Sequence, residues 1–284
     1  MNVNLIIDST TDLRPGLRER FTVVPLTVHF GEEEYIDGVT ISHREFYEKL
    51  VESDALPSTS QAVPAAFADV FEQVASRGET AVVLTLASQL SGTYQSAMIA
   101  ANDYPDSIFV VDGTSVAIGT GILAELALRL RDQGLSAAQI AAKLEEEKGN
   151  IRIVALLDTL EYLKRGGRIS ATVAFAGSLL SIKPVIAVQD GVIQMLGKAR
   201  GSKQGNNLLV QQIANAGGVD FDKPLLLGFT GLSDALLLKY IEDSRALWEN
   251  GTDNLPITSI GSVVGTHAGP GAIAVAFFHK PTGN

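Results

Sequence analysis

A single histidine lies in a glycine-rich stretch near the C-terminal end of the chain. The stretch reads GTHAGPGA at 265–272 and places His267 between two apolar runs rich in β-branched residues. One interpretation is a tight, hairpin-like connection in which the glycines supply positive φ angles. The other is a loop that brings backbone amides and an imidazole close to an anionic ligand, because a charged histidine donates two hydrogen bonds. The stretch lacks the Lys-Ser/Thr pair of a P-loop, which disfavours a nucleotide site.

A serine stands at a predicted strand-to-helix turn, in the stretch SQLSGTYQS at 88–96. The ordinary role of this residue, Ser91, would be that of a helix N-cap. A helix N-terminus also offers free N–H groups and positive potential, so a carboxylate or phosphate could bind there. Gln89 stands where the first glycine of a G-x-S-x-G nucleophile elbow belongs, which argues against a serine hydrolase.

Two further motifs carry side chains that could contact an anion. PSTSQ at 57–61 places Thr59 on a connection, where hydroxyl groups usually serve turns and caps. LKRGGRIS at 163–170 places Arg165 and Arg168 around a Gly-Gly helix end. Basic groups there commonly pair with the helix dipole, but they could also contact a phosphate or a partner protein.

The remaining histidines suggest no chemistry of their own. His29 ends a strand pattern, His43 lies at a polar helix start where we expect it to be exposed, and His279 lies near the C-terminal tail. No pair has a spacing such as H-E-x-x-H, so we predict no metal site. The chain has no cysteine, which excludes disulfides, thiolate catalysis and Cys-zinc sites.

Composition limits the classes of partner. The 284 residues are 46% hydrophobic, and 22 basic against 32 acidic residues give a net charge of −10. An acidic chain without a basic block repels phosphate backbones, so nucleic acid is an unfavourable partner. The N-terminus has no basic region and only a short apolar run, and no apolar stretch approaches the length of a membrane span. We therefore expect a soluble cytoplasmic protein without stable membrane insertion.

Strand patterns alternate with helix patterns in the first half of the chain. This alternation predicts an α/β fold with a parallel sheet whose faces are covered by helices. Ligands of such sheets bind beyond the carboxyl ends of the strands, and clusters of hydroxyl residues follow or face those ends. The predicted strands are 4–8, 22–30, 80–88 and 107–113, the predicted helices 42–53, 64–76, 91–101, 115–132 and 136–148, and the hydroxyl clusters 8–11, 58–60 and 88–93.

The charged stretch EEEKGN at 145–150 is the predicted domain boundary. Beyond it, Asp190-Gly191 between alternating apolar runs predicts a β-hairpin over 184–196. Two closing strands, 255–264 and 271–278, are expected to flank a loop that contains His267. Further strands are predicted at 151–159 and 223–231, and further helices at 159–170, 172–182, 203–216 and 233–250.

Eight motifs occur together along almost the whole chain. They are DSTTDL at 8–13, TSQ at 59–61, LSGTYQSA at 90–97, FVVDG at 109–113, LEYLKRGGRIS at 160–170, IKPVIAVQDGVI at 182–193, LGKARG at 196–201 and GTHAGPGA at 265–272. In this order they resemble the DegV family of bacterial fatty acid–binding proteins. LKRGGRIS and GTHAGPGA together carry most of the specificity.

The resemblance implies two α/β domains, 1–150 with a parallel sheet and flanking helices and 151–284 with a mixed sheet and helices. It implies one long-chain fatty acid buried between them, such as palmitate, stearate or an oleate-like acid, and no cofactor. Some members of the family are the binding subunit of a fatty acid kinase. They present the acid to an ATP-using subunit, and the acyl phosphate feeds lipid metabolism, so the resemblance implies a non-enzymatic carrier with a kinase partner.

The resemblance also assigns roles by motif. The carboxylate ligands are Thr59 of TSQ, Ser91 of LSGTY and His267 of GTHAGPGA, Gly92 lends a backbone amide, and Arg168 of KRGGRIS lies near the pocket mouth. The stretch GKARGSKQG at 197–205 departs from the family pattern at its Gly-Ser pair, where many relatives carry arginine or threonine. That departure weakens the expectation that this segment docks a kinase more than it weakens the expectation of a fatty acid pocket.

The lining of the tail is predicted separately from the head-group ligands. We expect it to include the apolar segment 172–182, namely Val173, Phe175, Leu179, Leu180 and Ile182.

Two other functions remain open from the sequence. One is a hydrolase with Ser91 as nucleophile, His267 as base and Asp8 or Asp112 as the orienting acid. The other is a small-substrate subunit similar to dihydroxyacetone kinases, in which a histidine holds the substrate. An apolar tunnel rather than a small polar pocket would distinguish a fatty acid–binding protein from the second alternative.

Overall fold

The computed structural model describes residues 2–53, 55–169, 182–249, 251 and 254–280, and the statements below concern these residues. Four strands of the first half form a parallel sheet in the order β2-β1-β6-β7. This confirms the α/β fold with an N-terminal parallel sheet. The strands are β1 (Val3–Asp8), β2 (Thr22–Val24), β6 (Thr80–Thr85) and β7 (Ile108–Asp112).

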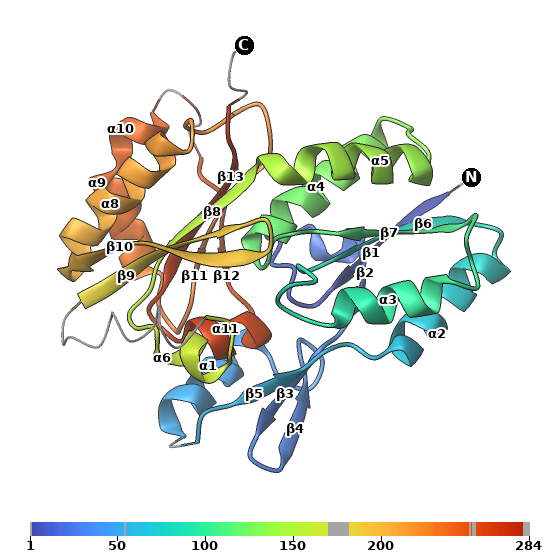
Figure 1. Cartoon of the computed structure of the whole chain (residues 1–284), viewed down its shortest axis with the longest axis horizontal. Coiled ribbons are helices and arrows are strands. Elements are labelled where there is room, and N and C mark those ends of the chain that lie inside the picture. Colours follow the sequence, from blue (N-terminus) through green and yellow to red (C-terminus); the bar gives the residue numbers. More distant parts are fainter. Residues whose placement is uncertain (1, 54, 170–181, 250, 252–253, 281–284) are drawn as a thin grey trace.

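Helices cover both faces of the parallel sheet (Figure 1). Alternate strand residues point to opposite faces, so Leu5 and Ile7 pack with one pair of helices and Ile6 and Val83 with the other. The first pair is α4 (Ile118–Asp132) and α5 (Ala137–Glu147), and the second is α2 (Pro64–Ser76) and α3 (Thr93–Ala101). Pro64 occupies the first turn of α2, as its fixed φ angle predicts.

The single strand predicted at 22–30 is wrong. The structure divides it into β2 and β3 (Thr27–Phe30), and β3 belongs to a separate antiparallel sheet in the order β4-β3-β5. Pro25 lies between the two strands, and a proline cannot donate the hydrogen bond that a continuous strand needs. The other members of the small sheet are β4 (Glu33–Ile36) and β5 (Ser58–Ser60). Helix α1 (His43–Glu52) follows β4, and Ser42 and Glu45 form a capping box at its start.

The second half forms the predicted mixed sheet, and the structure gives it six strands in the order β10-β9-β8-β13-β11-β12. Among the described strands of this sheet, only β11 and β12 pair in parallel. Asp190 and Gly191 both have positive φ angles, 52° and 75°, at the predicted hairpin turn. The strands are β8 (Ile151–Leu156), β9 (Ile182–Gln189), β10 (Val192–Arg200), β11 (Leu225–Phe229), β12 (Ile257–Ser259) and β13 (Ile273–Phe278).

One face of the mixed sheet is covered by α8 (Gly201–Asn215), α9 (Ala235–Asp243) and α10 (Arg245–Trp248) (Figure 1). We predicted one helix over 233–250, but the structure interrupts it at Ser244. The Ser244 hydroxyl donates to the carbonyl of Tyr240 at 2.6 Å and accepts from the indole of Trp248 at 2.9 Å. Such back-bonding by serine bends helices. Among the described helices, none is long and apolar enough to cross a membrane.

The stretch around His267 is a helix, which corrects the predicted strand and loop. Strand β12 ends at Ser259, and residues 262–268 form α11 (Ser262–Ala268). The β-branched Val263 and Val264 favoured a strand, and Gly265 is a poor helix former. Burial of the segment outweighs these local preferences, since Val263 and Gly265 are both buried. Gly269 and Gly271 follow the helix with positive φ angles, so part of the predicted turn chemistry is present there.

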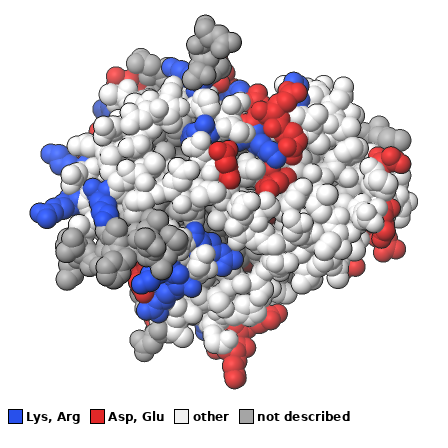
Figure 2. All heavy atoms as spheres, viewed as in Figure 1, with Lys and Arg blue, Asp and Glu red and all other residues white. Residues whose placement is uncertain are grey.

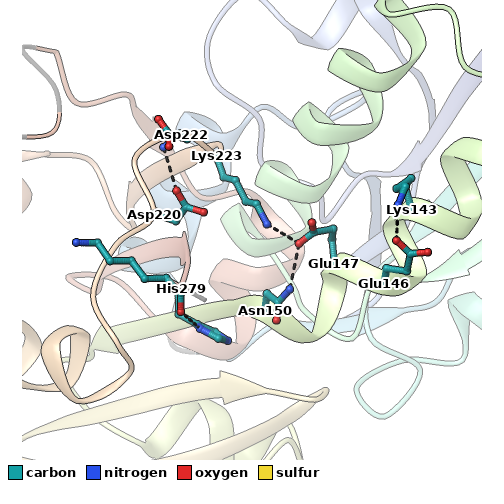
Figure 3. Close-up of polar contacts among 9 residues, drawn as sticks. Lys143, Glu146, Glu147, Asn150, Asp220, Asp222, Lys223 and His279 are labelled. Carbon is teal, nitrogen blue, oxygen red and sulfur yellow. Dashed lines mark hydrogen bonds and ion pairs between the residues drawn. The ribbon is translucent and has the colours of Figure 1, made fainter. Parts of the chain in front are cut away.

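The remaining short elements are α6 (Glu161–Arg165) and two 3₁₀ turns, η1 (Arg18–Arg20) and η2 (Lys148–Asn150). Helix α6 ends at Gly166, and Gly167 has a φ of 70°, as the Gly-Gly pair predicts. Near η2, the Lys223 ammonium lies 2.6 Å from Glu147, and the Asn150 amide donates to the same carboxylate (Figure 3). The Lys223–Glu147 ion pair joins the two halves of the chain on either side of residue 150.

Candidate functional site

A cavity lies between the mixed sheet and the N-terminal half of the chain. It contains about 920 Å³ of space, part of it open to solvent. Most of its lining is apolar. The sheet contributes Ile153, Ala155, Ile186, Val188, Ile193 and Ala274, and the remaining apolar lining includes Leu26, Leu86, Leu90, Val116, Ile118, Ile260, Val264 and Ala272.

Strand periodicity explains why the sheet has an apolar cavity wall. Ile153 and Ala155 point into the cavity. Val154 and Leu156, which alternate with them along β8, pack against the helices on the other face. Both faces of the central strands are therefore buried, and the sequence there is continuously apolar. The hydroxyl clusters predicted at the strand ends each supply a lining residue, namely Thr10, Thr59 and Ser91.

Four of the five predicted site residues line this cavity: Thr59, Ser91, Arg168 and His267. Thr59 on β5 and His267 in the last turn of α11 are joined by a hydrogen bond of 2.9 Å between the hydroxyl and Nε2, across 208 positions of sequence. The fold thus brings two of the predicted ligands into direct contact.

His267 occupies a largely desolvated position. Burial, and secondly the nearby Arg168 guanidinium, lower the pKa of its imidazole to about 4, so the ring is neutral at pH 7. Its Nδ1 atom is buried and makes no hydrogen bond with the described residues. Gly166 lies directly against Nδ1, because a Cβ atom built there would collide with it. Gly166 of the Gly-Gly pair therefore makes room for the imidazole, a role that the interpretation of the pair as a helix end did not include.

Ser91 precedes α3, which begins two residues later than predicted. Its hydroxyl accepts from the N–H of Thr93 at 3.3 Å and lies 3.0 Å from the Thr93 hydroxyl. Gly92 rather than Ser91 occupies the N-cap position of α3, so the predicted serine N-cap is one residue too early, although the Ser91 hydroxyl still accepts from the first N–H of the helix. Ser91 also lines the cavity, and anion binding at this helix start stays a prediction.

Gly92 does not line the cavity. It lies against Gln61, which does, so closely that a Cβ atom on Gly92 would collide with the Gln61 amide. Gln61 belongs to the TSQ motif, but no role was predicted for it from the sequence. Its amide donates to the Ser96 hydroxyl at 3.0 Å, which ties the end of β5 to α3.

Arg168 stands between the cavity and a second pocket. Its Nε donates to the carbonyl of Leu90 at 3.2 Å and its Nη1 to that of Gly166 at 2.6 Å. Thr59, Arg168 and His267 line both spaces and form the partition between them. The second, outer pocket contains about 710 Å³ of partly open space, and Ser58, Tyr162, Arg165 and Thr266 are among its other lining residues.

His43 is half-buried, which corrects the expectation that it is exposed. Burial lowers the pKa of its imidazole, and the Asp37 carboxylate opposes that effect. Within the described part of the chain, no group of three histidines or acids is arranged to hold a metal ion.

The hydrogen bonds do not form a hydrolytic triad among the predicted residues. His267 pairs with Thr59, and Ser91 pairs with Thr93. Asp8 accepts from Thr10 and from the N–H of Leu86, and Asp112 accepts from the N–H groups of Ser88 and Thr114.

The predicted tail-lining segment 172–182 lies almost entirely outside the described residues. Four of the five named residues therefore lie outside the described part of the chain, namely Val173, Phe175, Leu179 and Leu180. Ile182 is described, begins β9 and is not among the residues that line the cavity.

Comparison with known proteins places this geometry in a family. Residues 2–280 match the family described as "Uncharacterised protein, DegV family". This chain belongs to the DegV family. A DegV domain-containing protein of Caldanaerobacter subterraneus is 33% identical over 98% of this chain and 99% of its own length.

Solved structures of the DegV family share the fold. A DegV-family protein of Thermus thermophilus, described with fatty acid binding, has a TM-score of 0.86 at 30% identity and covers 98% of this chain and 100% of its own. A stearic acid–binding protein of Eubacterium ventriosum also has a TM-score of 0.86 at 30% identity, with 96% and 97% covered. The family and the fold class predicted from the motifs are thereby confirmed.

Proposed function

We propose that this protein binds one long-chain fatty acid, with the hydrocarbon tail in the apolar cavity and the carboxylate at its polar partition. The observation that supports this most directly is an apolar cavity with Thr59 and His267 hydrogen-bonded to each other on its lining. Stearic acid in the Eubacterium relative and fatty acid binding in the Thermus relative support the same class of ligand.

The energetics of such a ligand match the two kinds of lining. Burying a methylene group is worth about 0.8 kcal/mol, so ~14 of them contribute roughly 11 kcal/mol before costs. Association and ordering cost on the order of 4–15 kcal/mol. The tail therefore supplies the affinity. The carboxylate must be paired, because a buried unpaired charge is very unfavourable.

The head-group ligands in this proposal are Thr59, Ser91 and His267. Each hydrogen bond to a charged head contributes about 1.5–3 kcal/mol. Arg168 would border the carboxylate at the partition, and Gly92 would contribute a backbone amide beside Gln61. A palmitate-, stearate- or oleate-like acid is the expected bound molecule, with no further cofactor.

We further propose that the protein carries its acid to a kinase subunit rather than acting as an enzyme. This role rests on the family resemblance, and the outer pocket beside the partition supports it by giving a route to the head group. The division into two domains at about residue 150, with the acid between them, is part of the same proposal. The largely apolar cavity disfavours a small polar substrate of the dihydroxyacetone type.

Mass spectrometry of the organic extract from purified, denatured protein tests the binding proposal. We expect a C16–C18 fatty acid at about one per chain in the wild type. Thr59→Val, Ser91→Ala and His267→Ala should each retain less, whereas Ser58→Ala, on the neighbouring exposed position of β5, should match the wild type. An extract that contains no fatty acid, together with no uptake of added acid, would refute the proposal.

The kinase proposal needs a separate measurement. Loaded protein is incubated with ATP and candidate kinase subunits, and acyl phosphate is trapped with hydroxylamine. Formation of acyl hydroxamate that depends on both proteins is expected. Ester hydrolysis by the protein alone that disappears in Ser91→Ala would instead favour the hydrolase.

A further inference from the structure

Helix α11 approaches its neighbours through a row of glycines. Gly261, Gly265 and Gly269 follow one another at intervals of four and therefore lie on one side of the helix. A Cβ atom on Gly265 would come 2.5 Å from the Tyr47 hydroxyl, and one on Gly269 would collide with the Tyr162 ring. The cavity-lining residues Val263, Val264, His267 and Ala268 belong to the same helix. The position of α11 thus decides where the imidazole lies.

A buried carboxyl fixes the start of this helix. Asp12 is 4% exposed, and its Oδ1 accepts the N–H of Gly261 at 2.9 Å. Asp12 belongs to the DSTTDL motif at the end of β1. Its hydrogen bond to Gly261 joins residues 249 positions apart in the sequence. The Tyr47 hydroxyl donates to the carbonyl of Ile260 at 2.9 Å, one residue earlier. The Ile260 carbonyl and the Gly261 N–H belong to one peptide group, so two hydrogen bonds hold the peptide group that leads into α11.

Other charged groups surround this anchor. Asp37 and Asp8 lie near Asp12. The positive charge of Arg18 favours the ionised forms of both Asp12 and Asp37. His43 adjoins Gly261, where a Cβ atom would come 2.9 Å from its Nε2. Burial raises the pKa of Asp37, and the Ser9 and Ser262 hydroxyls beside its carboxylate oppose this rise, although these contacts lack the geometry of well-formed hydrogen bonds. Asp12 is the member of this cluster that accepts a backbone N–H from the start of α11.

A rigid connection leads from this anchor to the site. His267 follows Gly261 by six residues, about 9 Å along a helix at ~1.5 Å per residue. The α11 backbone continues from Gly261 through Gly265 to Gly269 by hydrogen bonds of 2.8 Å each. A displacement at Gly261 is therefore transmitted to the imidazole, which sits between Thr59 and Gly166 with little free space.

We propose that Asp12 is a positioning residue of the head-group site, which it controls by holding the N-terminal end of α11 and hence the place of the His267 imidazole. The inference rests on the proposed fatty acid site for its functional meaning. The placement of His267 itself is a property of the free protein and can be measured without any lipid.

The test compares two substitutions of similar size. Asp12→Asn keeps an oxygen that can accept the Gly261 N–H, whereas Asp12→Leu removes it. The imidazole resonances of His267 are recorded in the lipid-free protein and assigned from their loss in His267→Ala, since the chain has only four histidines. Binding of palmitate is measured on the same samples. Glu125→Leu is the control, because Glu125 is a buried carboxyl that pairs with Arg14 and Arg129 and makes no hydrogen bond to α11.

We expect Asp12→Leu to shift the His267 resonances and to weaken palmitate binding at least about tenfold. Asp12→Asn and Glu125→Leu should keep both near the wild-type values. Unshifted His267 resonances in folded Asp12→Leu overturn the proposal. If Asp12→Leu does not fold, Asp12→Asn decides: displaced resonances in that variant contradict it. Shifted resonances in a protein that binds no palmitate in any form would leave the positioning role standing and remove the fatty acid proposal instead.

Discussion

At the scale of single residues, the polar end of the cavity is arranged around a neutral histidine. The His267 imidazole is hydrogen-bonded to Thr59 through Nε2, and its Nδ1 is buried beside Gly166. A buried ring of this kind avoids the cost of a permanent charge while the cavity holds no acid. A carboxylate that arrives near it would favour the protonated ring, because an opposite charge raises a histidine pKa.

The lowered pKa of His267 predicts a specific pH dependence. Between about pH 6.5 and 4 the unfolded chain binds a proton at this residue and the folded lipid-free chain does not. Folded stability should therefore fall as the pH falls through this window, by at most roughly 3 kcal/mol. His267→Gln should remove that part of the slope in denaturant titrations at several pH values.

The His267→Gln variant is needed as a reference because the titration of Asp8 changes the folded stability with pH in the opposite direction. Burial raises the pKa of Asp8 to about 6, so its contribution falls as the pH rises through the range between 3.8 and 6. Arg168→Leu provides a second check, since removing the guanidinium should raise the pKa of His267. An imidazole that titrates at its ordinary pKa in lipid-free protein would contradict the buried, neutral arrangement.

Gly166 leads to a prediction about close approach. In Gly166→Ala the new methyl group would collide with Nδ1 of His267, so the ring must move away from Thr59. We expect at least about a tenfold loss of palmitate affinity, equivalent to ~1.4 kcal/mol, measured by isothermal titration. Gly167→Ala is the matched control. That position has a φ of 70° and open space around it, so the substitution should lower stability by about 1 kcal/mol but spare binding.

Residue types were predictable where a motif specified them. Thr59, Ser91, Arg168 and His267 could be named from the sequence, and all four line one cavity. The burial of His43 and the space provided by Gly166 could not, because both depend on chain segments distant in sequence. A glycine at a helix end has the same local signature whether or not an imidazole lies against it.

At the scale of elements, helix α11 is where local preference and structure disagree. Its sequence has two adjacent valines and glycines at intervals of four, which favour a strand and a turn. The packing with α1 and α6 requires those glycines, and only the assembled fold reveals this. Elements whose signals are local were predicted well, among them α2 behind Pro64, α1 behind Ser42 and the Asp190-Gly191 hairpin.

Gly265→Ala is the corresponding prediction for the element. The added methyl group would lie 2.5 Å from the Tyr47 hydroxyl and 2.8 Å from the Phe46 ring, so α11 must shift or the rings must move. Overpacking of this kind costs about 1–3 kcal/mol. We expect a lower free energy of unfolding and weaker palmitate binding. Gly149→Ala, in open space, should change neither, and equal behaviour of the two variants would argue against tight packing of α11.

At the scale of the whole molecule, the two halves share a core. One cluster of buried side chains includes Leu5, Ile122 and Leu144 from the first half and Ile153 and Phe278 from the second. Charged side chains of both signs are scattered over the face shown in Figure 2, and much of that face carries none. The sequence predicted the parallel sheet followed by the mixed sheet, but not the small antiparallel sheet of β3, β4 and β5. It did not predict how much apolar surface joins the halves, because residues far apart in sequence contribute it.

This shared core predicts that the proposed N-terminal domain is unstable alone. A fragment of residues 1–150 would expose the side of α4 that packs against β8, β11 and β13 of the second half. We expect it to aggregate or to bind hydrophobic dyes, and to show no cooperative unfolding by circular dichroism. Co-expression with residues 151–284 should restore a folded complex. A stable, monomeric 1–150 fragment would show that the halves are energetically independent.

Fatty acids should stabilise the whole protein in proportion to tail length. Each added methylene should tighten binding about fourfold, from ~0.8 kcal/mol, until the cavity is full. At 100 times the dissociation constant the stabilisation is about 2.7 kcal/mol. A series of C10 to C18 acids in thermal melts of lipid-free protein would measure it. Methyl esters, which lack the ionised head, serve as controls, and equal melting shifts for acid and ester would rule out a role for the polar partition.

The partition made by Thr59, Arg168 and His267 has one more consequence. The same three side chains line both the apolar cavity and the outer pocket. If the apolar cavity holds a fatty acid as proposed, a molecule in the outer pocket contacts the same three side chains whatever the length of the bound tail. Substitutions in the apolar lining would then change which acid is bound without changing the surface that faces the outer pocket.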